Sequence, residues 1–169
     1  MTSGRIDGVL RFLRHFPTGL TKSAQKDLAE TIVHESRHYG FDPELILAVI
    51  TAESSFNIAS RSPKGALGLM QLLPETASEM VGQENPDIVE TLLLDPVMNV
   101  RLGVRYLAYL VGQFGNLETA LTAYNRGIGS VSQRAEDIKS PQDPYADKIL
   151  RQYHTLLASD ISPYAPSTR

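Results

Sequence analysis

Residues 43–54 read PELILAVITAES, and this stretch decides the fold. Apolar side chains fill nearly every position from Leu45 to Ala52, so a helix formed here is apolar on almost all sides. Asp42 and Pro43 are a typical helix start, with an Asp as N-cap and a proline at the first helical position. A helix that is apolar all round has to be buried. We therefore predict that residues 43–54 form a core helix.

Similar start signals recur along the chain and predict three further helices. They are Leu73-Pro74, Asp95-Pro96 and Asp143-Pro144. Helical periodicity marks two more segments, residues 22–39 and 117–124. The longest helix should run from Pro96 to Phe114, where apolar residues recur every three or four positions. Because no segment shows the alternation of a strand, we predict a mainly α fold of six helices with little or no β structure.

The composition is that of one globular domain, since 169 residues suffice to bury a sizeable core. We expect an N-terminal extension at residues 1–20, a folded domain at residues 21–158 and a poorly ordered C-terminal tail at residues 159–169. The chain has no Cys, which excludes disulfides, thiol catalysis and thiolate metal sites. The longest apolar run, residues 45–50, is far shorter than the ~20 residues of a membrane-spanning helix, and no signal peptide is visible.

The formal net charge is −3, which gives no electrostatic reason to bind nucleic acid or anionic lipid. A neutral polar polymer such as a glycan is the ligand class that this charge favours. We expect no nucleic-acid partner.

Glu53 interrupts the apolar pattern of the predicted core helix. Ile46, Val49 and Ile50 share its face at helical spacing. Desolvation by these side chains and the negative end of the helix dipole both disfavour the anion, so the pKa of Glu53 should be raised. A carboxyl that stays protonated near neutral pH can act as a general acid. A solvated glutamate at a helix end is the alternative, but the polar residues that follow Glu53 are typical of the wall of a ligand cleft.

Four ordered blocks of residues carry a resemblance to a known family. They are YGFDP (39–43), ESSF (53–56), GALGLMQLLPETA (65–77) and AYN (123–125), with Gly127 and Tyr145 behind the last. Over about residues 39–153 the chain resembles the soluble-type lytic transglycosylases, which have an SLT domain and belong to the goose-lysozyme-like superfamily. The resemblance implies a lysozyme-like helical domain and an enzyme that cleaves the glycan strands of bacterial peptidoglycan without a cofactor.

The resemblance also implies the roles of single residues. Glu53 is the catalytic acid/base, and the substrate-binding residues are Ser54, Met70, Gln71, Tyr124, Asn125 and Tyr145. The chain departs from the family at Arg126 and Ile128, where smaller or proline-containing residues are usual. We expect a monomer that acts in the cell envelope or periplasm, with a secreted or phage-borne protein as the alternatives.

The resemblance implies a reaction with one carboxylate. Glu53 protonates the oxygen between N-acetylmuramic acid and N-acetylglucosamine, the substrate's acetamido group stabilises the cationic centre, and the C6 hydroxyl closes a 1,6-anhydro ring. Ordinary glycosidases need two carboxylates. The other acidic candidates are explained as three N-caps and one first-turn residue: Asp42, Asp95, Asp143 and Glu75. A goose-type lysozyme-like hydrolase, in which water attacks, is the close alternative, and a distant carboxylate such as Glu84 or Asp137 would support it.

A second motif points to another class of enzyme. His34, Glu35 and His38 match the His-Glu-x-x-His pattern of zinc metallopeptidases. The helical pattern of residues 22–39, however, predicts that both histidines lie opposite the apolar face, in solvent, and no third ligand follows at a suitable spacing. We therefore rank zinc catalysis well below glycan cleavage and expect no metal. A non-catalytic glycan-binding module is a third reading, and the retention of Glu53 argues against it.

Overall fold

The computed structural model describes residues 2–132 and 143–159, which form nine helices and no strand. Their bounds are Thr2–Leu13 (α1), Lys22–His38 (α2), Pro43–Ser54 (α3), Pro74–Val81 (α4), Pro86–Leu94 (α5), Pro96–Phe114 (α6), Leu117–Arg126 (α7), Ile128–Ser132 (α8) and Pro144–Leu157 (α9). The prediction of a mainly α fold is confirmed. Among the helices of the described ranges, none has both the length and the apolar character that crossing a membrane requires. The tail predicted to be poorly ordered, residues 159–169, lies outside the described residues except for Ser159.

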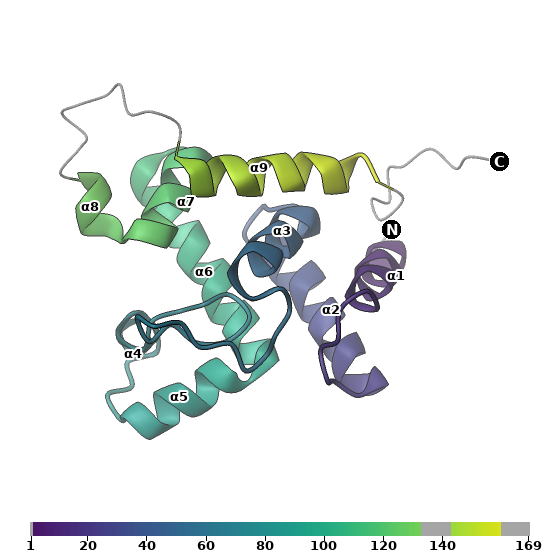
Figure 1. Cartoon of the computed structure of the whole chain (residues 1–169), viewed down its shortest axis with the longest axis horizontal. Helices are drawn as coiled ribbons and strands as arrows, with labels where there is room; N and C mark the ends of the chain where they lie inside the picture. The colour runs from purple at the N-terminus through teal and green to yellow at the C-terminus, as the bar shows by residue number, and fades with distance from the viewer. Residues whose placement is uncertain (1, 133–142, 160–169) are drawn as a thin grey trace.

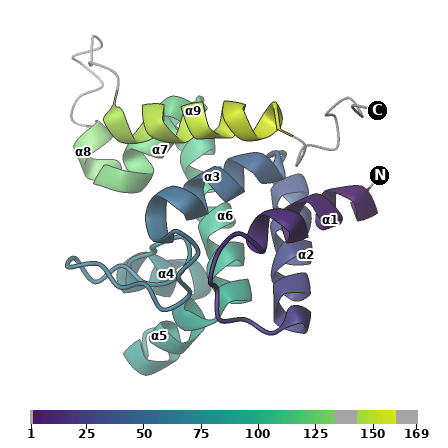
Figure 2. The ribbon, with the colours of Figure 1, turned by 45° about the vertical axis from the view of Figure 1, so that its right-hand side comes forward.

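The core helix α3 lies in the middle of the molecule, as Figure 1 shows. α9 runs along α3 on one side, and α2 crosses it on another, with α1 packed against α2 (Figure 2). Every side chain from Leu45 to Ile50 is at most 2% exposed, so the predicted burial of this helix is confirmed. α6 links the two ends of the molecule, because it contacts α7 at one end and α5 at the other.

All six predicted helices are present, and the bounds predicted for α6 are those observed. Its buried residues cover two faces of the helix because α6 separates two apolar clusters. Val100, Val104 and Leu107 belong to the large core around α3. Leu102 joins a smaller cluster formed with α4, α5 and the preceding loop.

Three helices of the structure were not predicted: α1, α5 and α8. α1 lies in the segment that the sequence indicated as an N-terminal extension, yet its residues Val9, Phe12 and Leu13 are buried in the large core. α5 begins like the predicted helices, with Asn85 as N-cap and a proline behind it. The Asn85 side chain accepts hydrogen bonds from the backbone N–H groups of Asp87 and Ile88.

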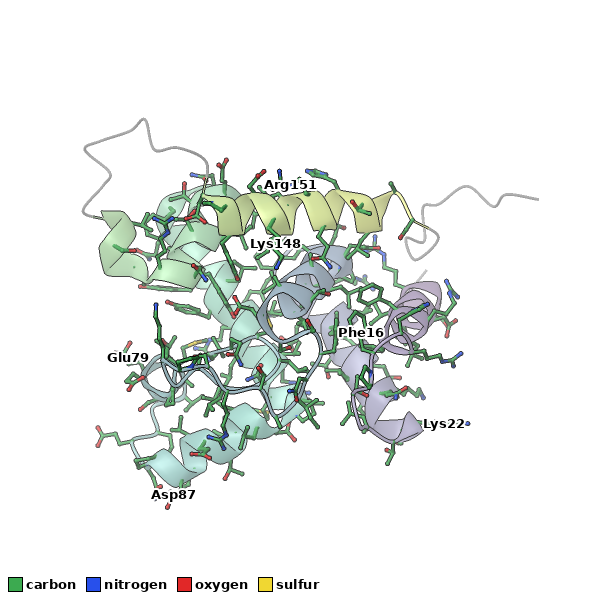
Figure 3. The ribbon with its side chains drawn as sticks, in the orientation of Figure 1. Phe16, Lys22, Glu79, Asp87, Lys148 and Arg151 are labelled. Carbon is green, nitrogen blue, oxygen red and sulfur yellow. The ribbon has the colours of Figure 1, made fainter. Side chains whose placement is uncertain are left out.

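The loop between α3 and α4 is irregular and turns sharply behind Glu53. Ser55 and Phe56 have φ values of 48° and 62°, in the left-handed region that non-glycine residues rarely adopt. Phe56 is only 1% exposed, and its ring lies 5.7 Å from that of Phe12 and 4.5 Å from that of Phe16. Figure 3 labels Phe16 beside this loop. Aromatic side chains of the N-terminal segment therefore hold the turn that follows the core helix.

Asn99 on α6 fastens the end of the same loop. Its side chain is fully buried, and its Oδ1 accepts the N–H of Met70 at 2.7 Å. Its Nδ2 donates to the carbonyls of Leu67 at 2.9 Å and Leu93 at 2.8 Å. Gly68 is required here, because a Cβ at that position would lie 2.3 Å from Asn99 Nδ2.

Candidate active site

Glu53 lies in the last turn of α3 and is partly buried. Tyr145, the second residue of α9, donates a short hydrogen bond from its Oη to Glu53 Oε1. The two residues are 92 positions apart in sequence, and the packing of α9 along α3 brings them together. Lys148 follows Tyr145 on the side of α9 that faces α3, whereas Arg151 points away (Figure 3).

Three influences act on the pKa of Glu53. Burial raises it and is the largest, whereas the hydrogen bond from Tyr145 and the positive charge of Lys148 lower it. The net direction is upward, as the sequence predicts. Burial and the neighbouring Glu53 carboxylate both raise the pKa of Tyr145, so its hydroxyl keeps its proton and remains a donor. Of this pair, Glu53 is therefore the group that exchanges its proton more readily.

Three tyrosines, Tyr124, Tyr106 and Tyr109, form an aromatic run near Glu53. Tyr124 on α7 donates from its Oη to the carbonyl of Met70 at 2.8 Å, and burial and the charge of Glu53 raise its pKa well above the usual value. Its ring lies 5.5 Å from that of Tyr106 on α6. Tyr106 in turn stacks at 6.4 Å on Tyr109, which is 50% exposed. Sequence reasoning missed Tyr106 and Tyr109, although their spacing of three places them on one face of the predicted helix.

Besides Tyr124 and Tyr145, two more of the predicted sugar-binding residues use their donors within the protein. The Ser54 hydroxyl donates to the carbonyl of Leu69 at 2.8 Å, which ties the end of α3 to the loop before α4. The Gln71 amide donates to the carbonyls of Ser60 at 3.1 Å and Gly68 at 2.9 Å. Both side chains hold the site together, and Gln71 does so from a left-handed backbone position with φ of 50°.

The prediction for Met70 needs correction, whereas Asn125 remains available to a ligand. Met70 has no exposed surface, because its side chain packs tightly on Gly103 of α6, where a Cβ would lie 2.4 Å from its sulfur. It therefore fills the space beneath the site and offers no surface to a sugar. Asn125 is exposed, one residue beyond Tyr124 on α7.

Of the three acidic residues predicted to be N-caps, two make a capping hydrogen bond in the structure. Asp95 caps α6 by accepting the N–H of Met98 at 2.7 Å, and Asp143 caps α9 by accepting the N–H of Tyr145 at 2.8 Å. Asp42 occupies the N-cap position of α3 but makes no capping bond, which corrects the prediction; its carboxylate accepts from the Tyr153 hydroxyl at 2.6 Å.

The buried carboxyl that sequence reasoning overlooked is Glu44, whose pKa burial raises. It stands nine residues before Glu53 on α3, or about 13 Å along the helix axis. That distance is too long for the paired carboxylates of ordinary glycosidases. Asp137, one of the acidic residues named as a possible partner, lies outside the described residues.

The residues of the zinc-like motif lie on α2, away from Glu53. His34 and His38 are exposed, as the helical pattern predicts. Glu35 pairs with Arg101 of α6 at 3.6 Å. A zinc enzyme of this type uses the glutamate as a general base, and here the pairing with Arg101 gives Glu35 a different role, as a link between α2 and α6.

The sequence predicts a departure from the family pattern at Arg126 and Ile128, and in the structure Arg126 has a defined partner. Its Nε lies 2.7 Å from Asp143 Oδ2, in an ion pair whose Asp143 side chain is nearly buried. This ion pair joins the end of α7 to the start of α9.

Comparison with known proteins places these features in a family. Residues 30–145 match the family described as the transglycosylase SLT domain. The lytic transglycosylase Slt from Pseudomonas aeruginosa, solved as an inactive mutant, is 32% identical over 73% of the chain with a TM-score of 0.54. The 70-kDa soluble lytic transglycosylase in complex with bulgecin A is 25% identical over 82% of the chain with a TM-score of 0.64.

The 70-kDa soluble lytic transglycosylase from Escherichia coli, at 23% identity over 91% of the chain and a TM-score of 0.60, supports the fold alone. The chain spans 20%, 26% and 31% of these three structures, about a fifth to a third of their length. The resemblance and the lysozyme-like helical fold predicted from the sequence are confirmed.

Proposed function

Because the chain belongs to the transglycosylase SLT domain family, we propose that it is a lytic transglycosylase that cleaves peptidoglycan glycan strands, with Glu53 as its acid/base. The observation that carries this proposal is the Glu53–Tyr145 pair, in which burial raises the pKa of a carboxyl at the end of a core helix. Two of the similar structures, at 32% and 25% identity, are lytic transglycosylases, and the first was solved as an inactive mutant. With peptidoglycan as the proposed substrate, we propose that the protein acts at the cell envelope.

The reaction that we propose uses one carboxyl twice. Protonated Glu53 donates its proton to the oxygen that links the muramoyl C1 to N-acetylglucosamine, and the C1–oxygen bond breaks. The acetamido group of the substrate stabilises the cationic centre, as in other substrate-assisted glycosidases. The muramoyl C6 hydroxyl then attacks C1 and gives its proton to the Glu53 carboxylate, which restores the starting state of the enzyme. Tyr145 supports the ionised intermediate stage through its hydrogen bond to Oε1.

The attacking group decides between a lyase and a hydrolase. A bound C6 hydroxyl avoids the entropy cost of positioning a second molecule, which favours the anhydro product. Glu44 is too far along α3 to activate water at the same centre. Mass spectrometry of the products from purified peptidoglycan separates the two outcomes, because the 1,6-anhydro product is one water lighter. Mainly reducing-end products would instead make the protein a lysozyme-like hydrolase.

We further propose that the glycan contacts the exposed part of the aromatic run and the neighbouring amide. Tyr109 offers an exposed ring face continuous with Tyr106 and Tyr124, and Asn125 offers donors and acceptors for acetamido and hydroxyl groups. Such groups bind a neutral sugar without charge. This contact surface replaces Met70, whose side chain is buried.

The decisive test is Glu53→Gln. The amide keeps an acceptor for Tyr145 but cannot donate an acidic proton, so lysis of cell walls should fall by about 10²–10⁴-fold or more. Because the folded-state pKa of Glu53 is raised, its stability contribution falls as pH rises through that pKa. The Gln variant should therefore be at least as stable as the wild type at pH 7, so that lost activity cannot be ascribed to unfolding.

Glu44→Gln is the matched control. Glu44 is also buried on α3 with a raised pKa, but it lies at the opposite end of the helix from Glu53. It should retain activity close to that of the wild type. A stable Glu53→Gln protein that clears cell walls at the wild-type rate contradicts the proposed function.

A further inference from the structure

Arg126 is the last residue of α7, and a chain of contacts leads from it to Glu53 in three steps. Arg126 Nε lies 2.7 Å from Asp143 Oδ2. The other oxygen of Asp143 accepts the backbone N–H of Tyr145 at 2.8 Å. Tyr145 donates from its Oη to Glu53. One carboxylate therefore connects the last residue of α7 to the residue that holds the catalytic candidate.

Asp143 is nearly buried, so its carboxylate depends on its protein partners. Asp143 is 8% exposed, whereas the Arg126 side chain is 40% exposed. A nearly buried carboxylate needs its partners, since each lost partner leaves charge that water cannot solvate. The backbone N–H groups at the start of α9 satisfy one oxygen, whereas the other makes no hydrogen bond within the described residues and has the Arg126 charge at 2.7 Å as its partner. The start of α9 is thereby fixed in position relative to α7.

Residues 133–142, between α8 and α9, lie outside the described residues. Within the described residues, two features fix the start of α9. They are its contacts with α3 and α7 and the Arg126–Asp143 ion pair. Tyr145 is two residues beyond Asp143, so a small rotation of the helix start displaces its hydroxyl directly.

We propose that the Arg126–Asp143 ion pair holds Tyr145 on Glu53, which makes Arg126 a positioning residue for the glycan cleavage proposed above. Arg126 touches neither Glu53 nor Tyr145 and acts through Asp143. In the absence of the ion pair, Tyr145 makes its hydrogen bond to Glu53 for a smaller share of the time.

The inference is tested by combining Arg126→Gln with Tyr145→Phe. If Arg126 acts through Tyr145, Arg126→Gln should lower kcat by roughly tenfold in the wild-type background, because small displacements of catalytic groups are costly. In the Tyr145→Phe background the same exchange should change kcat by less than about twofold, because the contact that it protects is already gone. Arg126→Lys, which keeps the charge, should recover part of the lost activity.

The pH profile provides a readout that a purely structural role does not move. Among the described residues, Lys148 on α9 acts on the pKa of Glu53 by its charge and Tyr145 by its hydrogen bond. The charge of Glu53 in turn raises the pKa of Tyr145 and of Tyr124 on α7. Tyr145 favours the ionised form of Glu53, so weakening its bond raises the pKa of Glu53. The basic limb of kcat/KM should therefore move to higher pH in Arg126→Gln, in the same direction as in Tyr145→Phe.

Arg151→Gln is the matched control. It removes an arginine that pairs at 2.7 Å with Asp147 within α9, on the side of the helix that points away from α3 (Figure 3). Kinetics and pH limb should stay as in the wild type. The inference fails if Arg126→Gln lowers only the melting temperature, if it leaves kcat unchanged, or if its effect multiplies with that of Tyr145→Phe. An active Glu53→Gln protein instead refutes the proposed function, so the two failures are distinguishable.

Discussion

Asn99→Ala should be among the most destabilising exchanges in the molecule. The side chain is fully buried and makes three hydrogen bonds to backbone groups of Leu67, Met70 and Leu93. The carbonyl of Leu67 also accepts the N–H of Leu72 at 3.2 Å, so truncation leaves two groups without the partner that the structure gives them. At about 1–3 kcal/mol for each buried unsatisfied group, the loss is about 4 kcal/mol, a large share of an ordinary domain's stability.

The assay is urea unfolding followed by circular dichroism, with Asn116→Ala as the matched exchange. Asn116 is exposed and caps α7 by accepting the N–H of Thr119 at 2.8 Å, so its truncation should cost about 1 kcal/mol. Asn99→Asp keeps the acceptor for Met70 but turns a carboxylate toward two carbonyls, and it should be no better than alanine. If Asn99→Ala and Asn116→Ala lower the free energy of unfolding by amounts within about 1 kcal/mol of each other, the reasoning is refuted. The buried hydrogen bonds of Asn99 would then contribute no more than an exposed helix cap.

Three other predictions follow from the packing, the charges and the exposed histidines. Gly103→Ala should cost about 1–3 kcal/mol through its clash with Met70, whereas Gly112→Ala, on the same helix with no atom near its Cβ, should be neutral or stabilising in thermal unfolding. Lys148→Gln removes a charge that lowers the pKa of Glu53, so the basic limb of kcat/KM should move to higher pH. Millimolar EDTA and the double exchange His34→Ala and His38→Ala should leave wall lysis unchanged; loss of activity that zinc restores would favour the metallopeptidase motif.

Helices that carry their own start signal and apolar periodicity were predictable from the sequence. α3 and α6 were found because apolar composition, periodicity and an N-cap followed by proline all agree within each segment. α5 carries the same start signal at Asn85, and reading it consistently would have found this helix. α1 has no such signal. It is helical in the fold because Val9, Phe12 and Leu13 are buried in the core, which is a tertiary contribution.

The site shows a similar limit. Glu53 was predictable because an acidic residue on an apolar helix face is a local anomaly, and the direction of its pKa followed from that pattern. Its pairing with Tyr145 depends on how α9 packs along α3, which no spacing reveals. Met70 was assigned the wrong environment because an irregular loop has no periodicity to separate inward from outward side chains. The role of Arg126 was hidden for the same reason as that of Tyr145, since its partner begins a different helix.

The strained turn behind Glu53 ties the site to the N-terminal segment. Left-handed conformations at the non-glycine residues Ser55 and Phe56 cost roughly 1–3 kcal/mol each, and they persist only where surrounding packing enforces them. Packing enforces the left-handed conformation at Phe56, because its buried ring lies against those of Phe12 and Phe16. Truncation of a buried phenylalanine costs about 3–5 kcal/mol, which is comparable to the cost of the two left-handed conformations. The direction in which the chain leaves α3 therefore depends on aromatic side chains about 40 residues earlier. The same side chains help to place the loop beside Glu53, which Ser54 and Gln71 fasten by hydrogen bonds. We infer that residues 2–16 are part of the folded unit that supports the site.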